Sequence, residues 1–397
     1  MMRFKYIYLI FIYGLPFIFS LLSRENKFIK ISYSEEYLIP TISARIKNKN
    51  FQIILDNNLN FNYITTKGFN LTDINFHIND DQINIKDKTY KAYFYIGDIS
   101  IFDEKNYIHL ENLNSFVIDD KSLFSSITIS YLLQQLKEEL FINKKMFYLD
   151  INNKICYFGE ILLDSEEYSK IFYSDRFVHT TFYSNNTKGI FKQELKSLYI
   201  KNNPIQINKL ISFFINEYYI IVPYSLLNEI SENKIISKLN CILQLIDQKG
   251  IYGIKCHKND ISKLPNLYFV FNNNYTFNIP FQLLFEDYDE DSKISLIRNK
   301  LKYNKVEKEN MDEDEEIILG YSLIKYLNYS IFSYEDRSVT FYSDKFISDH
   351  PPEFLNKIIY FLLCFLVCLL SIATPFLIYI KLKSKYYYRN YMDINIF

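Results

Sequence analysis

Short apolar runs alternate with polar clusters through most of the chain. The runs are rich in Ile, Tyr, Phe and Val and are separated by Asn, Asp and Lys, a pattern typical of β-strands bounded by turns. Examples are FQIILD, KAYFYIGDISIF, KMFYLDI, KICYFGEI and LYFVFNNNYTFNI. Few segments favour a helix, notably Ser130 to Leu140 and Pro223 to Glu232, the second opening with a proline. The pattern predicts an all-β protein with few short helices.

The two ends of the chain carry long uncharged stretches. Tyr6 to Ser23 follows Arg3 and Lys5 without a charge, which predicts a signal peptide over residues 1–23; an uncleaved anchor helix is the alternative. Residues 358–380 are also uncharged and are long enough to cross the ~30 Å hydrocarbon core, which predicts a transmembrane helix.

Basic residues follow this second apolar stretch directly, namely Lys381, Lys383, Lys385 and Arg389. Their position predicts that the tail, residues 381–397, is cytoplasmic. The rest of the chain is then a lumenal or extracellular ectodomain in the secretory pathway or at the cell surface, anchored as a type I single-pass protein.

Composition limits the classes of function. The chain has 397 residues, 49% of them hydrophobic, and a net charge of −1, so we expect a large core divided into two lobes and no nucleic-acid partner. Glycine is scarce, with 8 residues, and we therefore expect few backbone positions that require a positive φ.

The cysteines suit an oxidising compartment. Cys241 and Cys256 lie in two apolar segments joined by a Gly-containing turn, which predicts a disulfide across a hairpin. Cys156 is expected to be a buried free thiol. Cys364 and Cys368, four residues apart in the membrane segment, are expected to be apolar membrane residues, with palmitoylation or helix packing as the alternative.

Four sequons are acceptors for N-glycosylation if the host glycosylates, those of Asn70, Asn185, Asn274 and Asn328. Acidic runs at residues 286–292 and 311–316 lack the spacing of a calcium-binding EF-hand. We therefore expect a glycoprotein with no metal ion and no cofactor.

Four segments, in order, resemble the pepsin-like (A1 family) aspartic proteases. They are EYLIPTISARIKNKNFQIILDNN, LLQQLKEELFINKKMFYLDINNKICYFGE, KLPNLYFVFNNNYTFNIPFQLLF and IILGYSLIKYLNYSIFSYEDRSVTFYSD. The resemblance implies a bilobal pepsin-like acid protease fold, with an N-terminal lobe over residues 24–180 and a C-terminal lobe over 181–350. The tether and the AT-rich codon usage that the composition suggests are similar to those of the plasmepsins.

The resemblance also locates the two catalytic loops. The family needs one aspartate per lobe, and the two share a proton and hold a water molecule. Asp56 matches the first aspartate. Counting back from Pro223 places Phe214 where the second would stand, and the nearest acid is Glu217. Asparagines stand at both glycine positions, Asn58 and Asn216.

The hairpin that covers the substrate in this family is altered too. Residues 83–98 have no glycine before Gly97, and Lys86 stands at the tyrosine position unless a shifted hairpin presents Tyr90 instead. We therefore expect a catalytically inactive homologue, acting as a membrane-tethered module that binds a protein or peptide in the interlobe cleft. The alternatives are an active aspartic endopeptidase that uses Asp56 with a non-standard acid such as Glu217, a purely structural surface protein, and a different fold.

Overall fold

The computed structural model describes residues 28–35, 38–59, 61–66, 77–85, 88–161, 177–181, 191–248, 250–299, 316–343, 345–348, 350 and 352–394. The predicted signal peptide and the sequons of Asn70 and Asn185 lie outside the described residues, as does Lys86. The described part is mostly β, as the sequence predicts, and its strands form three sheets.

A seven-stranded sheet contains the early strands, in the order β2-β3-β8-β4-β7-β6-β5. Its members are β2 (Thr41–Ile46), β3 (Lys49–Asp56), β4 (Asn62–Thr65), β5 (His77–Ile85), β6 (Lys88–Phe102), β7 (Tyr107–Ile118) and β8 (Ser125–Thr128). Strand β2 pairs with both β3 and β6, so the sheet curls back on itself. The end of β3, which carries Asp56, is buried, and there β3 pairs with β8, with Asp56 opposite Thr128.

An eleven-stranded sheet contains most of the later strands, in the order β15-β16-β20-β14-β21-β13-β12-β17-β18-β24, with β19 paired to β20. Its members are β12 (Lys192–Ile200), β13 (Asn203–Phe213), β14 (Ile220–Val222), β15 (Ile242–Leu245), β16 (Tyr252–His257), β17 (Asn266–Phe271), β18 (Thr276–Pro280), β19 (Phe285–Asp287), β20 (Ser292–Asn299), β21 (Ile317–Leu319) and β24 (Ile347–Ser348). Parallel pairing of β13 with β21 brings the end of β13 beside Leu319, and this fixes where the loop containing Phe214 begins.

A six-stranded sheet joins the two halves of the chain, in the order β1-β10-β9-β22-β23-β11. Its members are β1 (Phe28–Ser32), β9 (Met146–Asp150), β10 (Ile155–Gly159), β11 (Phe177–Thr181), β22 (Tyr329–Ser333) and β23 (Ser338–Tyr342). Early strand β9 pairs with late strand β22 in the middle of this sheet. The two larger sheets are therefore connected through a continuous hydrogen-bonded layer.

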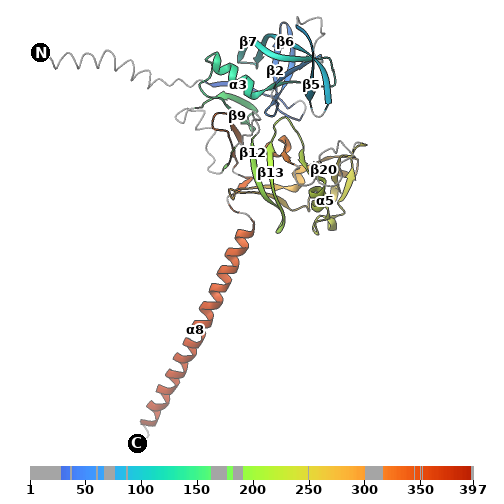
Figure 1. Ribbon diagram of the computed structural model, residues 1–397. Coiled ribbons are helices and arrows are strands. Elements are labelled where there is room, and N and C mark those ends of the chain that lie inside the picture. The colour runs from blue at the N-terminus through green and yellow to red at the C-terminus, as the bar shows by residue number, and fades with distance from the viewer. Residues whose placement is uncertain are drawn as a thin grey trace, which may run out of the picture.

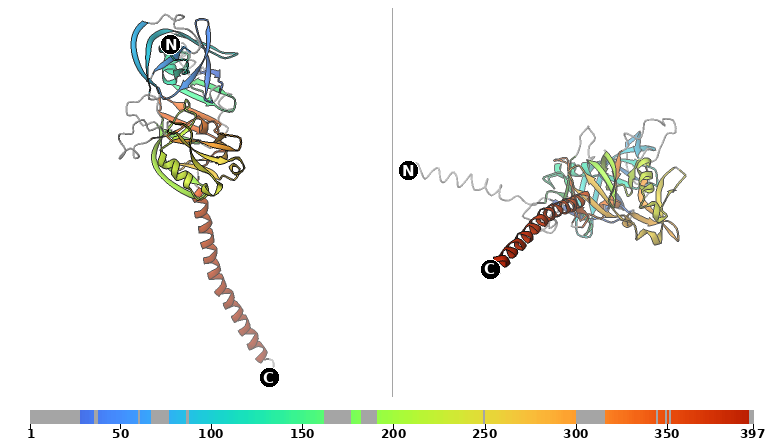
Figure 2. Two further views of the ribbon diagram at one scale, coloured as in Figure 1. Left: turned by 90° about the vertical axis from the view of Figure 1, so that its right-hand side faces the viewer. Right: turned by 90° about the horizontal axis from the view of Figure 1, so that it is seen from below.

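Within the described ranges, the helices are few and short apart from the last. They are α3 (Ile129–Glu138), α5 (Tyr224–Glu232), α6 (Lys258–Ile261), α7 (Tyr321–Ile324), the 3-10 helices η3 (Ser237–Leu239) and η4 (Phe281–Leu284), and α8 (Pro352–Ile394). Both helices predicted from sequence are confirmed as α3 and α5. Helix α8 projects away from the β-sheets as a single rod (Figures 1 and 2), and its residues 357–384 are long and apolar enough to span a membrane.

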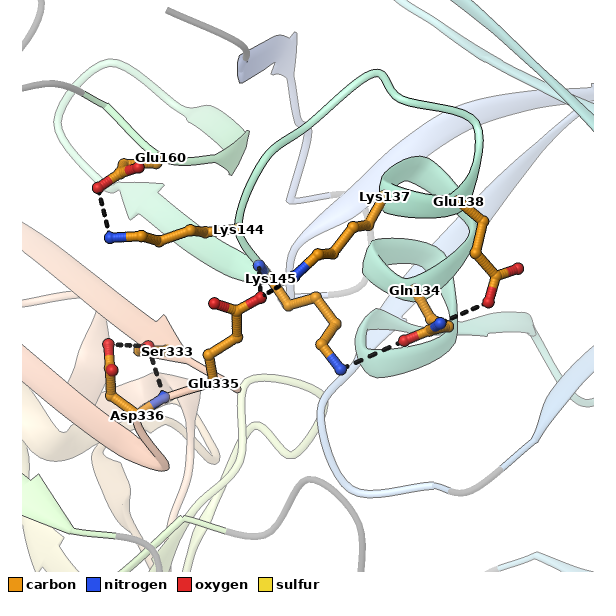
Figure 3. Close-up of polar contacts among 9 residues, drawn as sticks. All are labelled: Gln134, Lys137, Glu138, Lys144, Lys145, Glu160, Ser333, Glu335 and Asp336. Atoms are coloured by element: carbon orange, nitrogen blue, oxygen red, sulfur yellow. Dashed lines mark hydrogen bonds and ion pairs between the residues drawn. The ribbon is translucent and has the colours of Figure 1, made fainter. Parts of the chain in front are cut away.

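Charged contacts add a second link between the early and late parts of the chain. Lys137 of α3 forms an ion pair with Glu335, which lies in the turn between β22 and β23. The backbone N–H of Lys145 donates to the same carboxylate at 3.3 Å. Figure 3 shows Glu335 reaching between these two partners.

Most of the positive-φ positions among the described residues fall on residues other than glycine. Ten described non-glycine residues have a positive φ, among them Leu140, Lys154, Asn240 and Asn274, whereas two glycines do. Asparagine tolerates this conformation well, and the other residue types adopt it at a modest energetic cost. In this chain, scarce glycine means that other residues take up the left-handed turns.

Candidate functional site

Asp56 lies buried at the last position of β3, with 3% of its surface exposed. Its Oδ1 accepts hydrogen bonds from the backbone N–H groups of Asn58 at 2.7 Å and Leu59 at 2.9 Å. These bonds turn the chain sharply after the strand, as an Asx-turn does. One carboxylate oxygen is thus used to hold its own loop.

Asn57 connects this loop to the facing one. Its side-chain Nδ2 donates to the carbonyl oxygen of Phe213 at 2.7 Å, and its Oδ1 accepts from the backbone N–H of Ile215 at 3.1 Å. The two hydrogen bonds hold the backbone on either side of Phe214. The Asn57 amide therefore links the two loops, and the structure brings Asp56 and Phe214 onto neighbouring loops.

Asn216 provides a contact to Asp56 that the sequence does not predict. Its Nδ2 donates to Oδ2 of Asp56 at 2.7 Å, and Ser126 Oγ lies 3.5 Å from the same oxygen. Asn216 is one of the two asparagines that the sequence resemblance places at glycine positions. The buried Oδ1 of Asn216 has no hydrogen-bond partner among the described residues. A neutral amide thus meets the carboxylate directly.

The position counted as the second aspartate holds an apolar side chain. Phe214 is 8% exposed, and its backbone N–H donates to the carbonyl oxygen of Leu319 at 3.1 Å. Glu217, the nearest acid in sequence, has its Oε1 3.4 Å from the backbone N–H of Tyr219. Its carbonyl oxygen accepts from the N–H of Tyr321. These contacts direct Glu217 towards its own turn and the start of α7.

Gly320 supports this loop through its lack of a side chain. A Cβ atom added there would lie 2.2 Å from the carbonyl oxygen of Tyr219 and 2.6 Å from that of Glu217. The backbone of the loop therefore packs directly onto the β21–α7 turn. A side chain at position 320 would therefore clash with this backbone, and glycine is the residue that fits.

The predicted covering hairpin is formed by β5 and β6, with Ile83 paired to Tyr90. It packs through a small apolar cluster of Tyr63, Ile83, Ile85, Ala92 and Ile118, against which Tyr90 is partly buried. Tyr63 belongs to β4, just after the Asp56 loop. The hairpin is therefore attached to that loop by side-chain packing.

The charge of Asp56 affects the tyrosines around it. Burial, with the Asp56 charge as a smaller cause, raises the pKa of Tyr63. The same two causes, in the same order, raise the pKa of Tyr334. Both phenols stay protonated and neutral across the physiological range, so neither provides a base. The Asp56 carboxylate itself accepts hydrogen bonds from two backbone N–H groups, the Asn216 amide and the Ser126 hydroxyl.

The remaining predicted sites are distributed over the C-terminal half of the chain. Cys241 and Cys256 are joined by a disulfide. Asn274 is exposed at the turn between β17 and β18. Asn328 is half-buried, and the hydroxyl-bearing residue of its sequon, Ser330, is fully buried.

Of the unpaired cysteines, Cys156 is buried, and burial raises the pKa of its thiol well above the usual range. Cys364 and Cys368 are exposed on α8. No group of three or more His, Cys, Asp or Glu side chains that could hold a metal ion occurs within the described ranges.

Comparison with solved structures identifies the fold. The chain superposes on an aspartic proteinase from Irpex lacteus with a TM-score of 0.59 and 9% identity, covering 80% of this chain and 98% of that one. Conglutin gamma, a basic 7S globulin from lupine seeds, gives a TM-score of 0.59 and 10% identity, covering 81% of this chain and 96% of that one. Basic 7S globulin from soybean gives a TM-score of 0.58 and 10% identity, covering 79% of this chain and 94% of that one.

These similarities show a pepsin-like fold and nothing finer, since all are at or below 10% identity. No protein-family model and no characterised protein matches the sequence. The fold occurs in a protein named as a proteinase and in proteins named as seed globulins. Whether this chain is an enzyme therefore depends on the residues at the site.

Proposed function

We propose that this protein is a catalytically inactive relative of the pepsin-like aspartic proteases, tethered to a membrane, whose interlobe cleft binds another protein or a peptide. One observation carries the proposal: the Asp56 carboxylate is bonded by the Asn216 amide at 2.7 Å. In a working dyad a second carboxyl group lies against the first, and the pair activates a water molecule by exchanging the roles of acid and base. An amide cannot take part in that proton transfer.

The arrangement of sheets supports two lobes. The seven-stranded and eleven-stranded sheets each contain one of the facing loops, and the six-stranded sheet joins them. In our proposal the loops of Asp56 and Phe214 form the floor of the cleft between the lobes, over residues 24–180 and 181–350. The hydrogen bonds of Asn57 hold these two loops together and need no catalytic group; we call this contact the junction. A retained junction with a lost dyad suits a binding protein.

Membrane anchoring is supported by α8, which has 28 residues of membrane-like hydropathy. The proposed topology is type I, with the β-sheets lumenal or extracellular and residues 381–397 in the cytoplasm, because the basic residues follow the apolar span. The relationship to plasmepsins remains part of this proposal, as does glycosylation.

A transition-state inhibitor tests the loss of the dyad. Pepsin-class inhibitors carry a hydroxyl group that binds between the two carboxyl groups, and such analogues bind far more tightly than substrates. We expect such an inhibitor to leave the thermal unfolding midpoint of the full-length protein unchanged, as it does that of the Asp56→Ala variant. A stabilisation seen in the wild type and absent from Asp56→Ala would favour the alternative, an aspartic endopeptidase with a non-standard second acid.

Photocrosslinking tests the binding role. A photoreactive phenylalanine in place of Tyr90, which lies in the hairpin beside the Asp56 loop, should crosslink to a partner protein in cells. The same group in place of Tyr107, which is exposed at the start of β7, is the matched control. Equal crosslinking from both positions, or none from Tyr90, would argue for a purely structural surface protein.

A further inference from the structure

The outer face of the seven-stranded sheet holds a serine and a histidine side by side. Ser100 of β6 lies directly opposite His109 of β7 in the antiparallel pairing, so their side chains are on the same face of the sheet. The neighbours of Ser100 along its strand, Ile99 and Ile101, are buried in the core. Because side chains alternate between the two faces of a strand, Ser100 and His109 lie on the face that points away from the core.

An aspartate completes the cluster. Ser100 Oγ lies 3.2 Å from Nδ1 of His109, and Nε2 of His109 lies 3.8 Å from Oδ2 of Asp98. The second distance is too long for a hydrogen bond, so the carboxylate acts on the ring through its charge. This charge favours the proton of the neutral imidazole on Nε2, which makes Nδ1 the acceptor for the hydroxyl proton of Ser100. The groups therefore stand in the order nucleophile, base and orienting acid.

Asp98 is held in this place by a β-bulge. The register of β6 and β7 shifts between Gly97 and Ile99, and Asn112 on β7 has a φ of 53°. The backbone N–H of Asn112 donates to Oδ1 of Asp98 at 3.1 Å, which leaves Oδ2 on the side of the histidine. Bulges redirect side chains in this way and are frequent next to active sites.

The surroundings of Ser100 limit what can reach it. Ser100 is 6% exposed, and the hydroxyl of Tyr107 lies 2.6 Å from its Oγ. Tyr107 itself is 61% exposed, so its ring has room to move aside while its hydroxyl still donates to an oxygen near Ser100. Arg45 of β2 is paired with Ser100 on the other side. A hydroxyl donor and a cation therefore flank the serine, as the stabilisation of a negative oxygen requires.

We propose that Ser100 is a nucleophile that hydrolyses small carboxylic esters, with His109 as its base and Asp98 as the charge that stabilises the protonated ring. Ser100 Oγ bonds to the ester carbonyl carbon and passes its proton to Nδ1 of His109. The alkoxide leaves with that proton as an alcohol, which gives an acyl-serine. A water molecule, deprotonated by His109, then breaks the acyl-serine bond, releases the acid and restores Ser100.

Two observations define the class of substrate. The side chains of His109 and Asp98 are 45% and 56% exposed, and water weakens electrostatic stabilisation at such a surface. Esters need less of this stabilisation than amides because an alkoxide leaves more readily than an amine anion. The 6% exposure of Ser100 admits only a small acyl group. This activity is separate from the Asp56 loops and from the membrane tether.

Covalent labelling of the full-length protein tests the nucleophile. A fluorophosphonate probe forms a bond between phosphorus and an activated serine oxygen with loss of fluoride, and peptide mass spectrometry identifies the labelled residue. Ser43 of β2 is the matched control, because its hydroxyl accepts from the side-chain amide of Gln52 at 3.1 Å. We expect the label on Ser100 and none on Ser43. His109→Gln should slow the labelling about a hundredfold, the loss typical of a general base.

Release of p-nitrophenol from p-nitrophenyl acetate tests turnover. Wild type and Ser43→Ala should hydrolyse the ester repeatedly and at equal rates, whereas Ser100→Ala should show only the background reaction. Equal labelling of Ser100 and Ser43, or no label on Ser100, would overturn the inference. So would labelling of His109→Gln at the wild-type rate, or equal p-nitrophenol release by wild type and Ser100→Ala. Ser100 would then be an ordinary hydrogen-bonded residue of the sheet.

Discussion

Replacing Asn57 by alanine should destabilise the protein strongly. The substitution removes two hydrogen bonds, from Nδ2 to the carbonyl oxygen of Phe213 and from the N–H of Ile215 to Oδ1. Phe213 and Ile215 are fully buried, so each of these backbone groups loses its partner away from water. A buried unsatisfied polar group costs about 1–3 kcal/mol, which gives about 2–6 kcal/mol for the two.

Urea unfolding of the full-length protein in detergent, followed by near-ultraviolet circular dichroism of its tyrosines, measures this loss. Asn58→Ala is the matched control, because the hydrogen bond described for Asn58 comes from its backbone N–H. We expect that control to change stability by less than about 0.5 kcal/mol. Asn57→Thr should recover part of the loss, since a hydroxyl group both donates and accepts. Equal unfolding midpoints for Asn57→Ala and Asn58→Ala would refute the proposed junction.

Three further predictions concern charge and covalent structure. Asn216→Asp should place two carboxyl groups together and raise the pKa of the pair, so the variant should lose stability relative to wild type as the pH rises from acid to neutral. Burial alone would raise the pKa of Asp103, but hydrogen bonds from three backbone N–H groups outweigh it and hold the pKa at about 2. The Asp103 carboxylate therefore stabilises the fold above its unfolded-state pKa of 3.8, and this stabilisation is lost as the pH falls towards 2. Unfolding curves measured over a range of pH should lose this dependence on acid pH in the Asp103→Asn variant. Replacing Cys241 and Cys256 by alanine should cost about 3 kcal/mol in urea unfolding, because the bond closes a loop of 15 residues.

The fold could be anticipated because local pattern and segment order both point to it. Apolar runs of strand length predict the β-rich character, and α3 and α5 appear where spacing and a leading proline predict them. The pairing of β9 with β22 in the connecting sheet is less accessible from sequence. This pairing joins residues far apart in the chain, and the sequence of neither strand indicates which strand it pairs with.

The sequence assigns Asp56 and Phe214 to two loops, but it does not give the contacts between those loops. Spacing places Asp56 and Phe214 on their loops because the count uses backbone positions alone. The roles of Asn57 and Asn216 depend instead on where two side chains reach in space. In the sequence, Asn216 indicates only that a glycine is missing. In the structure, its amide forms a hydrogen bond with the Asp56 carboxylate.

The most direct test of the central claim is peptide cleavage by the full-length protein, measured with a peptide library from about pH 3 to 7, where carboxyl dyads operate. Wild type and Asp56→Ala are compared, with and without a pepsin-class inhibitor. We predict no inhibitor-sensitive cleavage by either protein, because in the proposed site Asn216 bonds the Asp56 carboxylate and Phe214 stands at the second catalytic position. Cleavage by wild type that the inhibitor blocks and Asp56→Ala abolishes would show that the protein is an aspartic endopeptidase.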